Sequence, residues 1–220
     1  MSTELAAGGY TLGEEIAHAV SHGIGILLSI AGLVLMVVFA ALYGNAWHVV
    51  SCSIYGATLI LLYTASTLYH GITLPRAKGV LRRIDHAAIF LLIAGTYTPF
   101  TLVPLRGAWG WTLFGLVWGF GALGVILETS LKRRIKWLSI SLYLGLGWLV
   151  VIAIGPLLEA VASGGLVLLL AGGLCYSLGV IFYIWKRLAY HHAVWHIFVM
   201  AGSLLHFLSV FFYVLPPAEG

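Results

Sequence analysis

The segment "HGIGILLSIAGLVLMVVFAALYGNAWHVVSC", residues 22–52, decides the fold class because it contains no Asp, Glu, Lys or Arg. The run without these charges extends further, from Glu15 to Arg76. A helix needs about 20 apolar residues to cross the roughly 30 Å of hydrocarbon in a bilayer. The run therefore predicts two membrane-spanning helices, with Gly44 and Asn45 forming the turn between them.

The composition of the whole chain agrees with this expectation. Of its 220 residues, 61% are hydrophobic and 8% are charged, whereas ordinary soluble domains have roughly 25% charged residues. The apolar runs are continuous and about twice as long as the roughly 10-residue alternating segments of a membrane β-barrel. We therefore expect an all-α integral membrane protein, with one transmembrane domain covering residues 1–220.

The charged and turn-forming residues divide the chain into seven expected helices. We place them at residues 17–43, 47–70, 84–103, 108–127, 137–158, 165–185 and 191–214. Pro99 and Pro156 fall inside two of these ranges and predict kinks, which neighbouring helices can accommodate in a bundle. The expected architecture is a seven-helix transmembrane bundle.

The basic residues predict the orientation of this bundle. Ten of the eleven Lys and Arg residues follow the second, fourth and sixth expected helices: Arg76, Lys78, Arg82, Arg83, Lys132, Arg133, Arg134, Lys136, Lys186 and Arg187. Positive residues favour cytoplasmic loops, which predicts a cytoplasmic N-terminus, an external C-terminus and a multi-pass protein of the cell (inner) membrane. The isoelectric point near 9.1 then reports topology, and we expect no nucleic-acid partner.

Histidines near the expected cytoplasmic face suggest a metal site. His192 and His196 lie one turn apart on one helix face, so they can share a metal ion or simply meet water at the interface. His70 ends the second expected helix and Asp85 begins the third, which places both at the same level. Three neutral imidazoles with a water ligand form a common open zinc site. Ser66 precedes His70 by one turn, so we predict metal ligation by the three histidines and catalytic roles for Asp85 and Ser66.

Other titratable residues are secondary candidates. Glu15, His18 and His22 recur at spacings of three and four on one helix face. They form either a second metal-binding or proton-relay group, or an interfacial polar stripe that packs against other helix ends. His206 lies ten residues beyond His196, about 15 Å along the helix axis. We expect it either to bond to a neighbouring helix or to line a pocket or relay.

Three motifs in this order resemble those of the hemolysin III family, within the progestin and adipoQ receptor superfamily that includes the adiponectin receptors. The motifs are "EIAHAVSHGIG" at residues 15–25, "STLYH" at residues 66–70 with the following Asp85, and "HAVWH" at residues 192–196 with the following His206. The resemblance covers all seven expected helices. It implies a seven-helix bundle with the N-terminus inside the cell.

The resemblance also implies a zinc ion near the cytoplasmic leaflet. Its ligands would be His70, His192 and His196, with Asp85 holding a zinc-bound water and Ser66 close by. The first motif of the family often has Asn where this chain has a histidine, at residue 18.

The superfamily is related to alkaline ceramidases, which makes zinc-dependent hydrolysis of a membrane lipid amide or ester our expected function. Some bacterial members are linked to membrane-fluidity homeostasis, so we expect a role in membrane lipid homeostasis. A receptor or sensor with structural zinc is the first alternative. The second is a pore-forming cytolysin, since bacterial members are named for the lysis of red cells.

Overall fold

The chain is helical throughout the part that the computed structural model describes, residues 9–131 and 135–217. Within these ranges there is no β-strand, and the helices pack as one bundle. In chain order they are α1 (Leu12–Tyr43), α2 (Ala46–Gly71), α3 (Pro75–Leu102), α4 (Ala108–Ser130), α5 (Lys136–Gly147), the 3-10 helix η1 (Leu149–Ala153), α6 (Ile154–Ala160), α7 (Ser163–Ile184) and α8 (His191–Tyr213).

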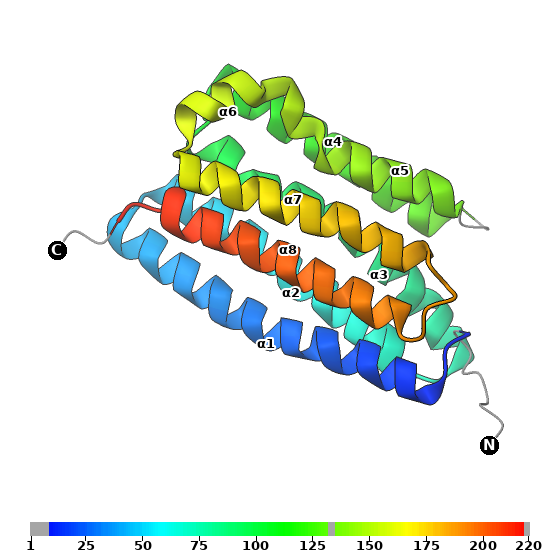
Figure 1. The fold of residues 1–220 in the computed structure, drawn as a ribbon. Helices are drawn as coiled ribbons and strands as arrows, with labels where there is room; N and C mark the ends of the chain where they lie inside the picture. Colours follow the sequence, from blue (N-terminus) through cyan, green and yellow to red (C-terminus); the bar gives the residue numbers. More distant parts are fainter. Residues whose placement is uncertain (1–8, 132–134, 218–220) are drawn as a thin grey trace.

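The helices pack mainly against their neighbours in sequence, and the last helix closes the bundle on the first. α1 packs on α2, α2 on α3, α3 on α4, α7 on α8, and α8 on α1. Figure 1 shows α1, α8 and α7 running side by side, with α4 and α5 along the opposite side of the bundle. Because α1, α3 and α8 all begin at the same end, the histidines predicted for one level lie together there.

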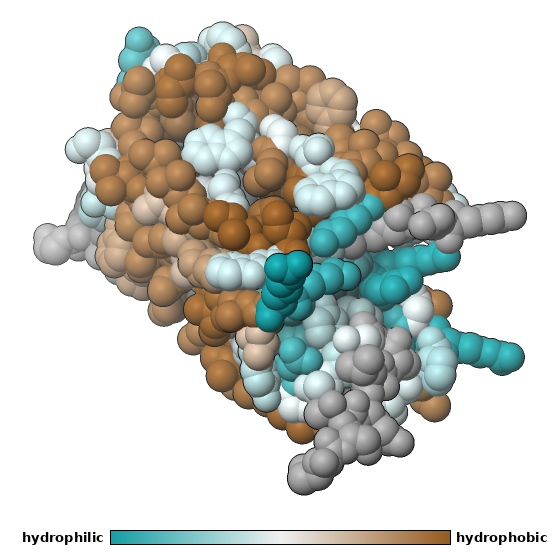
Figure 2. All heavy atoms as spheres, turned by 45° about the vertical axis from the view of Figure 1, so that its right-hand side comes forward, coloured by the Kyte–Doolittle hydropathy of each residue, from teal (hydrophilic) through white to brown (hydrophobic). Residues whose placement is uncertain are grey.

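Six helical segments of the described chain are long and apolar enough to cross a membrane: α1, α2, α4, α7, α8, and α5 with η1 and α6 taken together. α3 is not among them. It carries Asp85, His86 and several threonines, which are buried in the bundle. Large apolar side chains cover much of the outer surface, and hydrophilic side chains gather at one end (Figure 2). The chain therefore has the surface of an integral membrane protein.

The ends of the helices differ from the expected ranges where polar residues cap or extend them. α1 begins at Leu12 because Thr11 forms a capping box with Glu14. α3 begins at Pro75, nine residues before the expected start at residue 84, with proline in the first turn where its missing N–H costs nothing. The cations in residues 76–83 therefore lie on a helix. Lys132, Arg133 and Arg134, counted above among the loop cations, lie outside the described residues.

The expected helix 137–158 is broken in the middle. α5 ends at Gly147, η1 follows, and Pro156 lies in the first turn of α6. The hydroxyl of Tyr97 donates to the carbonyl of Gly147 at 2.7 Å and accepts from the N–H of Val150 at 2.9 Å. A side chain of α3 thus satisfies backbone groups that the break leaves without helical partners, which allows irregular backbone at membrane depth.

Candidate metal centre

Three imidazoles meet at the end of the bundle where α2 ends and α8 begins. His70 lies in the last turn of α2, and His192 and His196 lie in the first two turns of α8. One potential ligand atom from each residue lies within 4.8 Å of those of the other two, and all three side chains are buried. Zinc binds an imidazole nitrogen at about 2.0–2.1 Å, so the three rings would move toward an ion placed between them. The three histidines can therefore hold one metal ion.

The hydrogen bonds of two of these rings leave a free lone pair for a metal. Nδ1 of His70 lies 2.7 Å from Oε2 of Glu15, and the carboxylate can only accept, so Nδ1 carries the proton. Nδ1 of His196 lies 3.0 Å from Oγ of Ser21, whose own proton goes to the carbonyl of His18. In both rings Nε2 is then unprotonated. Partners that fix the tautomer in this way are typical around metal ligands.

Buried nitrogen atoms without partners also point to a missing ligand. Nε2 of His70 and Nδ1 of His192 are inaccessible to solvent and make no hydrogen bond. Buried polar atoms almost always have a partner, and exceptions often mark an ion or a water. These atoms fit a metal bound among the three rings.

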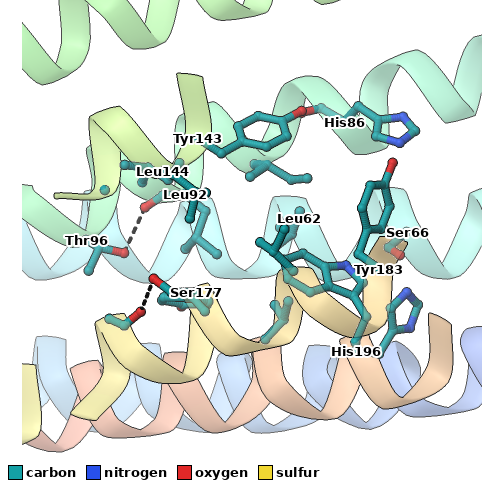
Figure 3. Close-up of a pocket in the computed structure, with 18 of the residues that line it drawn as sticks. Leu62, Ser66, His86, Leu92, Thr96, Tyr143, Leu144, Ser177, Tyr183 and His196 are labelled. Carbon is teal, nitrogen blue, oxygen red and sulfur yellow. Dashed lines mark hydrogen bonds between the residues drawn. The ribbon is translucent and has the colours of Figure 1, made fainter. Parts of the chain in front are cut away.

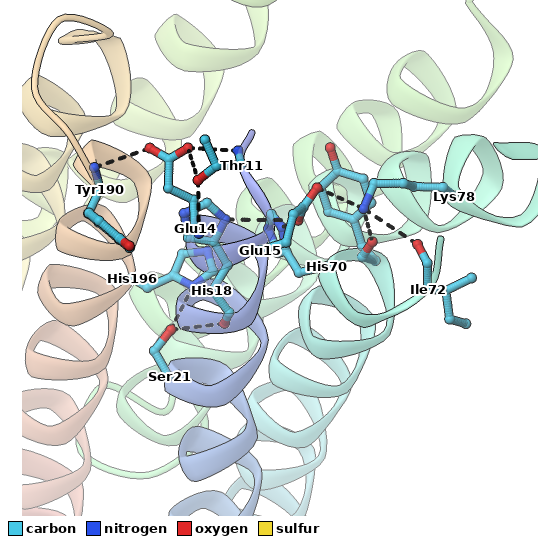
Figure 4. A network of polar contacts seen from close by, with 11 residues as sticks. Thr11, Glu14, Glu15, His18, Ser21, His70, Ile72, Lys78, Tyr190 and His196 are labelled. Atoms are coloured by element: carbon cyan, nitrogen blue, oxygen red, sulfur yellow. Dashed lines mark hydrogen bonds and ion pairs between the residues drawn. The ribbon is translucent and has the colours of Figure 1, made fainter. Parts of the chain in front are cut away.

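Glu15 is held in turn by a buried cation. Its Oε1 lies 2.9 Å from Nζ of Lys78, which also donates to the carbonyl of Tyr69 at 3.0 Å. Figure 4 shows Lys78, Glu15 and His70 in one continuous network. In the sequence, the position of Lys78 predicts only topology. It precedes Asp85 by seven residues, two helical turns, and that spacing would have placed both on the inner face once α3 was extended to Pro75.

The secondary candidates of α1 join the same cluster. The ring of His18 lies 4.6 Å from that of His70 and 4.8 Å from that of His192, between centroids. The ring of His22 stacks on that of His196 at 3.5 Å, with the planes 8° apart. All four ring nitrogens of His18 and His22 are buried without hydrogen bonds. With Glu15 and His70, His18 forms a second group of potential ligand atoms within 4.8 Å of one another.

Tyr10, which no sequence motif indicates as a site residue, covers the cluster from outside the bundle. Its ring centroid lies 4.8 Å from that of His18 and 5.4 Å from that of His192. Burial raises the pKa of Tyr10, so the phenol is neutral. Glu14 fixes the segment, because its carboxylate accepts from the N–H of Thr11 and from the N–H of Tyr190. Tyr10 thus limits access of water to the histidines.

Asp85 and Ser66 line a cavity that begins at the histidines. His192 and His196 also line it. Figure 3 shows Ser66 and His196 at one end of this cavity, with Thr96 near the other end. The remaining lining is mostly apolar. The structure therefore places both predicted catalytic residues on the lining of a cavity that they share with two of the candidate ligands.

His206 lies away from the cluster and lines the far part of this cavity. It also lines a second, more apolar cavity that continues along the bundle. The two volumes, about 130 Å³ and 240 Å³, together reach the lower end of the range of about 300–1,000 Å³ found for small-molecule sites. His206 lines the cavity, and the hydrogen bond of its Nδ1 goes to the carbonyl of Gly202 in its own helix rather than to a neighbouring helix.

Comparison with known proteins shows the family of this chain. Residues 10–207 match the model of the family described as haemolysin-III related. The chain is 50% identical over 204 residues to the hemolysin-3 homolog of Bacillus subtilis (strain 168), covering 93% of this chain and 96% of the relative. It is 47% identical over 206 residues to hemolysin-3 of Bacillus cereus, covering 94% of each. It is 27% identical over 213 residues to the human monocyte to macrophage differentiation factor, covering 91% of this chain and 84% of the relative. The chain belongs to the haemolysin-III-related family of membrane proteins.

Proposed function

We propose that the chain is a zinc-dependent hydrolase that cleaves an amide or ester bond of a membrane lipid and so serves membrane lipid homeostasis. One observation carries this proposal. Two of the three imidazoles that can hold a metal, those of His192 and His196, line a largely apolar cavity, and a carboxylate and a hydroxyl, those of Asp85 and Ser66, line the same cavity. An acyl chain in the cavity would place its carbonyl group beside the metal.

Zinc fits the residues of this site. His70, His192 and His196 would hold it, and three neutral imidazoles are a common ligand set for catalytic zinc. Bound zinc supplies a Lewis acid that polarises a carbonyl and lowers the pKa of water toward about 7. Glu15 orients His70 through the 2.7 Å hydrogen bond described above.

The remaining roles fall to residues beside the metal position. The carboxylate of Asp85 would orient the attacking water, accept its proton and return that proton to the leaving nitrogen or oxygen as the acyl bond breaks, which requires hydrogen-bonding distance to both. The hydroxyl of Ser66 donates a hydrogen bond to the oxygen of the substrate carbonyl as negative charge develops there. Tyr10 restricts exchange with bulk water while the bond is cleaved.

The membrane topology that goes with this function has seven spans, α3 being the seventh. The polar side chains of α3 face the bundle interior, so the helix can cross the bilayer although its sequence is less apolar than the others. Exposed cations such as Arg76, Arg82 and Lys186 lie near the start of α3 and just after α7, at the end of the bundle that carries the histidines. Figure 2 shows hydrophilic side chains gathered at one end of the molecule. By the positive-inside rule this end and the N-terminus are cytoplasmic. The substrate would then come from the cytoplasmic leaflet of the inner membrane.

The test uses the full chain purified in lipid nanodiscs. We expect one zinc per chain, and release of fatty acid from a ceramide or an acyl ester. Asp85→Asn should keep the zinc and lose hydrolysis, while Glu128→Gln, a buried carboxylate of α4 bonded to Ser139, should keep both. Zinc that is absent, or is retained undiminished by a His192→Ala and His196→Ala double variant, contradicts the site.

A receptor or sensor with structural zinc is the second candidate, and His18 favours it. Its ring centroid lies 4.6–5.4 Å from those of His70, His192 and His196. In a tetrahedral site with four imidazoles these separations would be about 5 Å, from the zinc–nitrogen length of about 2.0 Å. A fourth imidazole would close the site to water. Zinc that is bound without any hydrolysis, in a chain that responds to bilayer composition, would favour this candidate.

A pore-forming role is the third candidate and rests on the relatives named hemolysin-3. It predicts leakage from liposomes that persists when the histidines are replaced. Leakage that disappears with the zinc would instead connect it to the metal site.

A further inference from the structure

At the junction between the two interior cavities, one side-chain nitrogen has no hydrogen-bond partner among the described residues. Six residues line both cavities: Thr96, Tyr97, Gly147, Trp148, Gly173 and His206. Four of them have polar side chains. Their hydrogen bonds decide what chemistry a ligand meets at this point.

Every side-chain donor at the junction is already used within the protein. The hydroxyl of Thr96 donates to the carbonyl of Leu92 at 2.8 Å. The hydroxyl of Tyr97 donates to the α5 backbone, and the indole N–H of Trp148 donates to Oγ of Ser177 at 3.0 Å. A ligand at the junction therefore meets no free side-chain donor.

The imidazole of His206 is different. Its Nδ1 lies 2.8 Å from the carbonyl of Gly202, which can only accept, so Nδ1 carries the proton and Nε2 is an unprotonated acceptor. The side chain is more than nine-tenths buried, and no protein group bonds to Nε2 in the described chain. The neighbouring helix α7 packs closely against this ring. Gly172 of α7 faces the imidazole, and a methyl group on residue 172 would collide with the ring.

The position of His206 along α8 sets the depth of its Nε2 atom relative to the histidine cluster. His206 lies ten residues beyond His196, about 15 Å along α8 at 1.5 Å per residue, which is half of a hydrocarbon layer about 30 Å thick. Beyond it the second cavity continues between apolar side chains such as Phe100, Leu113 and Leu169. A chain that enters from the metal end passes His206 part-way along its length.

From this arrangement we propose that His206 determines specificity, by accepting a hydrogen bond from a hydroxyl group part-way along the acyl chain of the ligand. The ligand class is therefore a hydroxylated fatty acyl chain. An unsubstituted chain would leave Nε2 buried without a partner, which is unfavourable. The inference rests on the proposed function in one respect, that the interior cavities bind an acyl chain.

The experiment measures displacement of a fluorescent unsubstituted fatty acid from the full chain in nanodiscs. The competitors are three fatty acids of equal length: one unsubstituted, one hydroxylated in mid-chain and one hydroxylated beside the carboxylate. One neutral hydrogen bond predicts that the mid-chain hydroxylated acid competes about fivefold to tenfold more strongly than the other two.

Two variants locate the effect. His206→Phe keeps a ring of similar shape and removes the acceptor, so the preference should disappear while the unsubstituted acid still binds. Thr96→Val, at the same junction, removes a hydroxyl whose proton is already donated to Leu92, so the preference should persist. Both variants should keep the zinc content of the wild type, because neither residue belongs to the histidine cluster.

The outcomes separate this inference from the function on which it rests. Equal competition by the three acids in the wild type overturns the inference alone, and needs no variant. A preference that survives in His206→Phe also overturns it. If the fluorescent fatty acid itself does not bind, both the inference and the acyl-chain role of the cavity are wrong.

Discussion

Glu15→Gln should weaken zinc binding without abolishing it. The carboxylate accepts a 2.7 Å hydrogen bond from Nδ1 of His70, and it is buried and paired with Lys78. An amide keeps the shape but loses the charge that makes the imidazole a better ligand. Removal of such a partner typically costs 10–100-fold in metal affinity, or about 1.4–2.7 kcal/mol. The stoichiometry should remain one zinc per chain, because the three imidazoles are unchanged.

The assay is a zinc titration of the full chain against a fluorescent chelator of known affinity. Glu14→Gln is the matched control, since it removes the adjacent carboxylate, which caps α1 and contacts Tyr190. We expect its dissociation constant to change by less than twofold. An unchanged constant for Glu15→Gln would refute the orienting role of Glu15. Complete loss of zinc would also refute it and would make Glu15 a direct ligand.

Three further predictions concern the packing around the site. Lys78→Met leaves the buried carboxylate of Glu15 without its cation and should lower the free energy of unfolding by about 3 kcal/mol. Thermal unfolding in detergent measures this change. An unchanged unfolding midpoint would show that water screens the ion pair. His18→Asn should keep one zinc per chain if three imidazoles suffice, so loss of zinc on the same titration would identify a fourth ligand. Gly172→Ala forces a methyl group into an imidazole on α8 and should destabilise the chain by about 1–3 kcal/mol. Gly173→Ala, whose methyl would lie 3.7 Å from an indole ring, should have little effect, and equal effects of the two would contradict the packing.

The sequence predicts the helices and the grouping of the histidines because both depend on signals that can be read along the chain: the apolar runs and the depth in the membrane at which each residue lies. Apolar runs report spans directly, and their lengths place His70, Asp85 and His192 at one depth. The expected start of α3 is wrong, because the four cations in residues 76–83 indicate a loop by their charge but lie on the helix. A helix that extends out of the membrane can carry such charges as well as a loop can. The sequence alone does not distinguish a charged loop from a charged helix end.

The features that were not predicted arise from contacts between helices. The break after Gly147 depends on the hydroxyl of Tyr97, a residue of another helix. The proline of the expected helix, Pro156, suggested a kink several residues later. Likewise, nothing local to Lys78 indicates that it points at a carboxylate of α1, and nothing local to Tyr10 places it over the histidines. Such roles follow only from the arrangement of the bundle.

The position of the candidate metal centre also determines which experiments can assign its role. α2 packs mainly on α1 and α3, while α8 packs mainly on α7 and α1. An ion bound by His70 of α2 and by His192 and His196 of α8 therefore links two helices that are not principal neighbours. Any ligand that binds only the folded state stabilises it, so zinc should raise the unfolding temperature whether it is catalytic or structural. Loss of activity after chelation therefore cannot separate a catalytic zinc from a structural one. A replacement of Asp85 that keeps the metal can separate them.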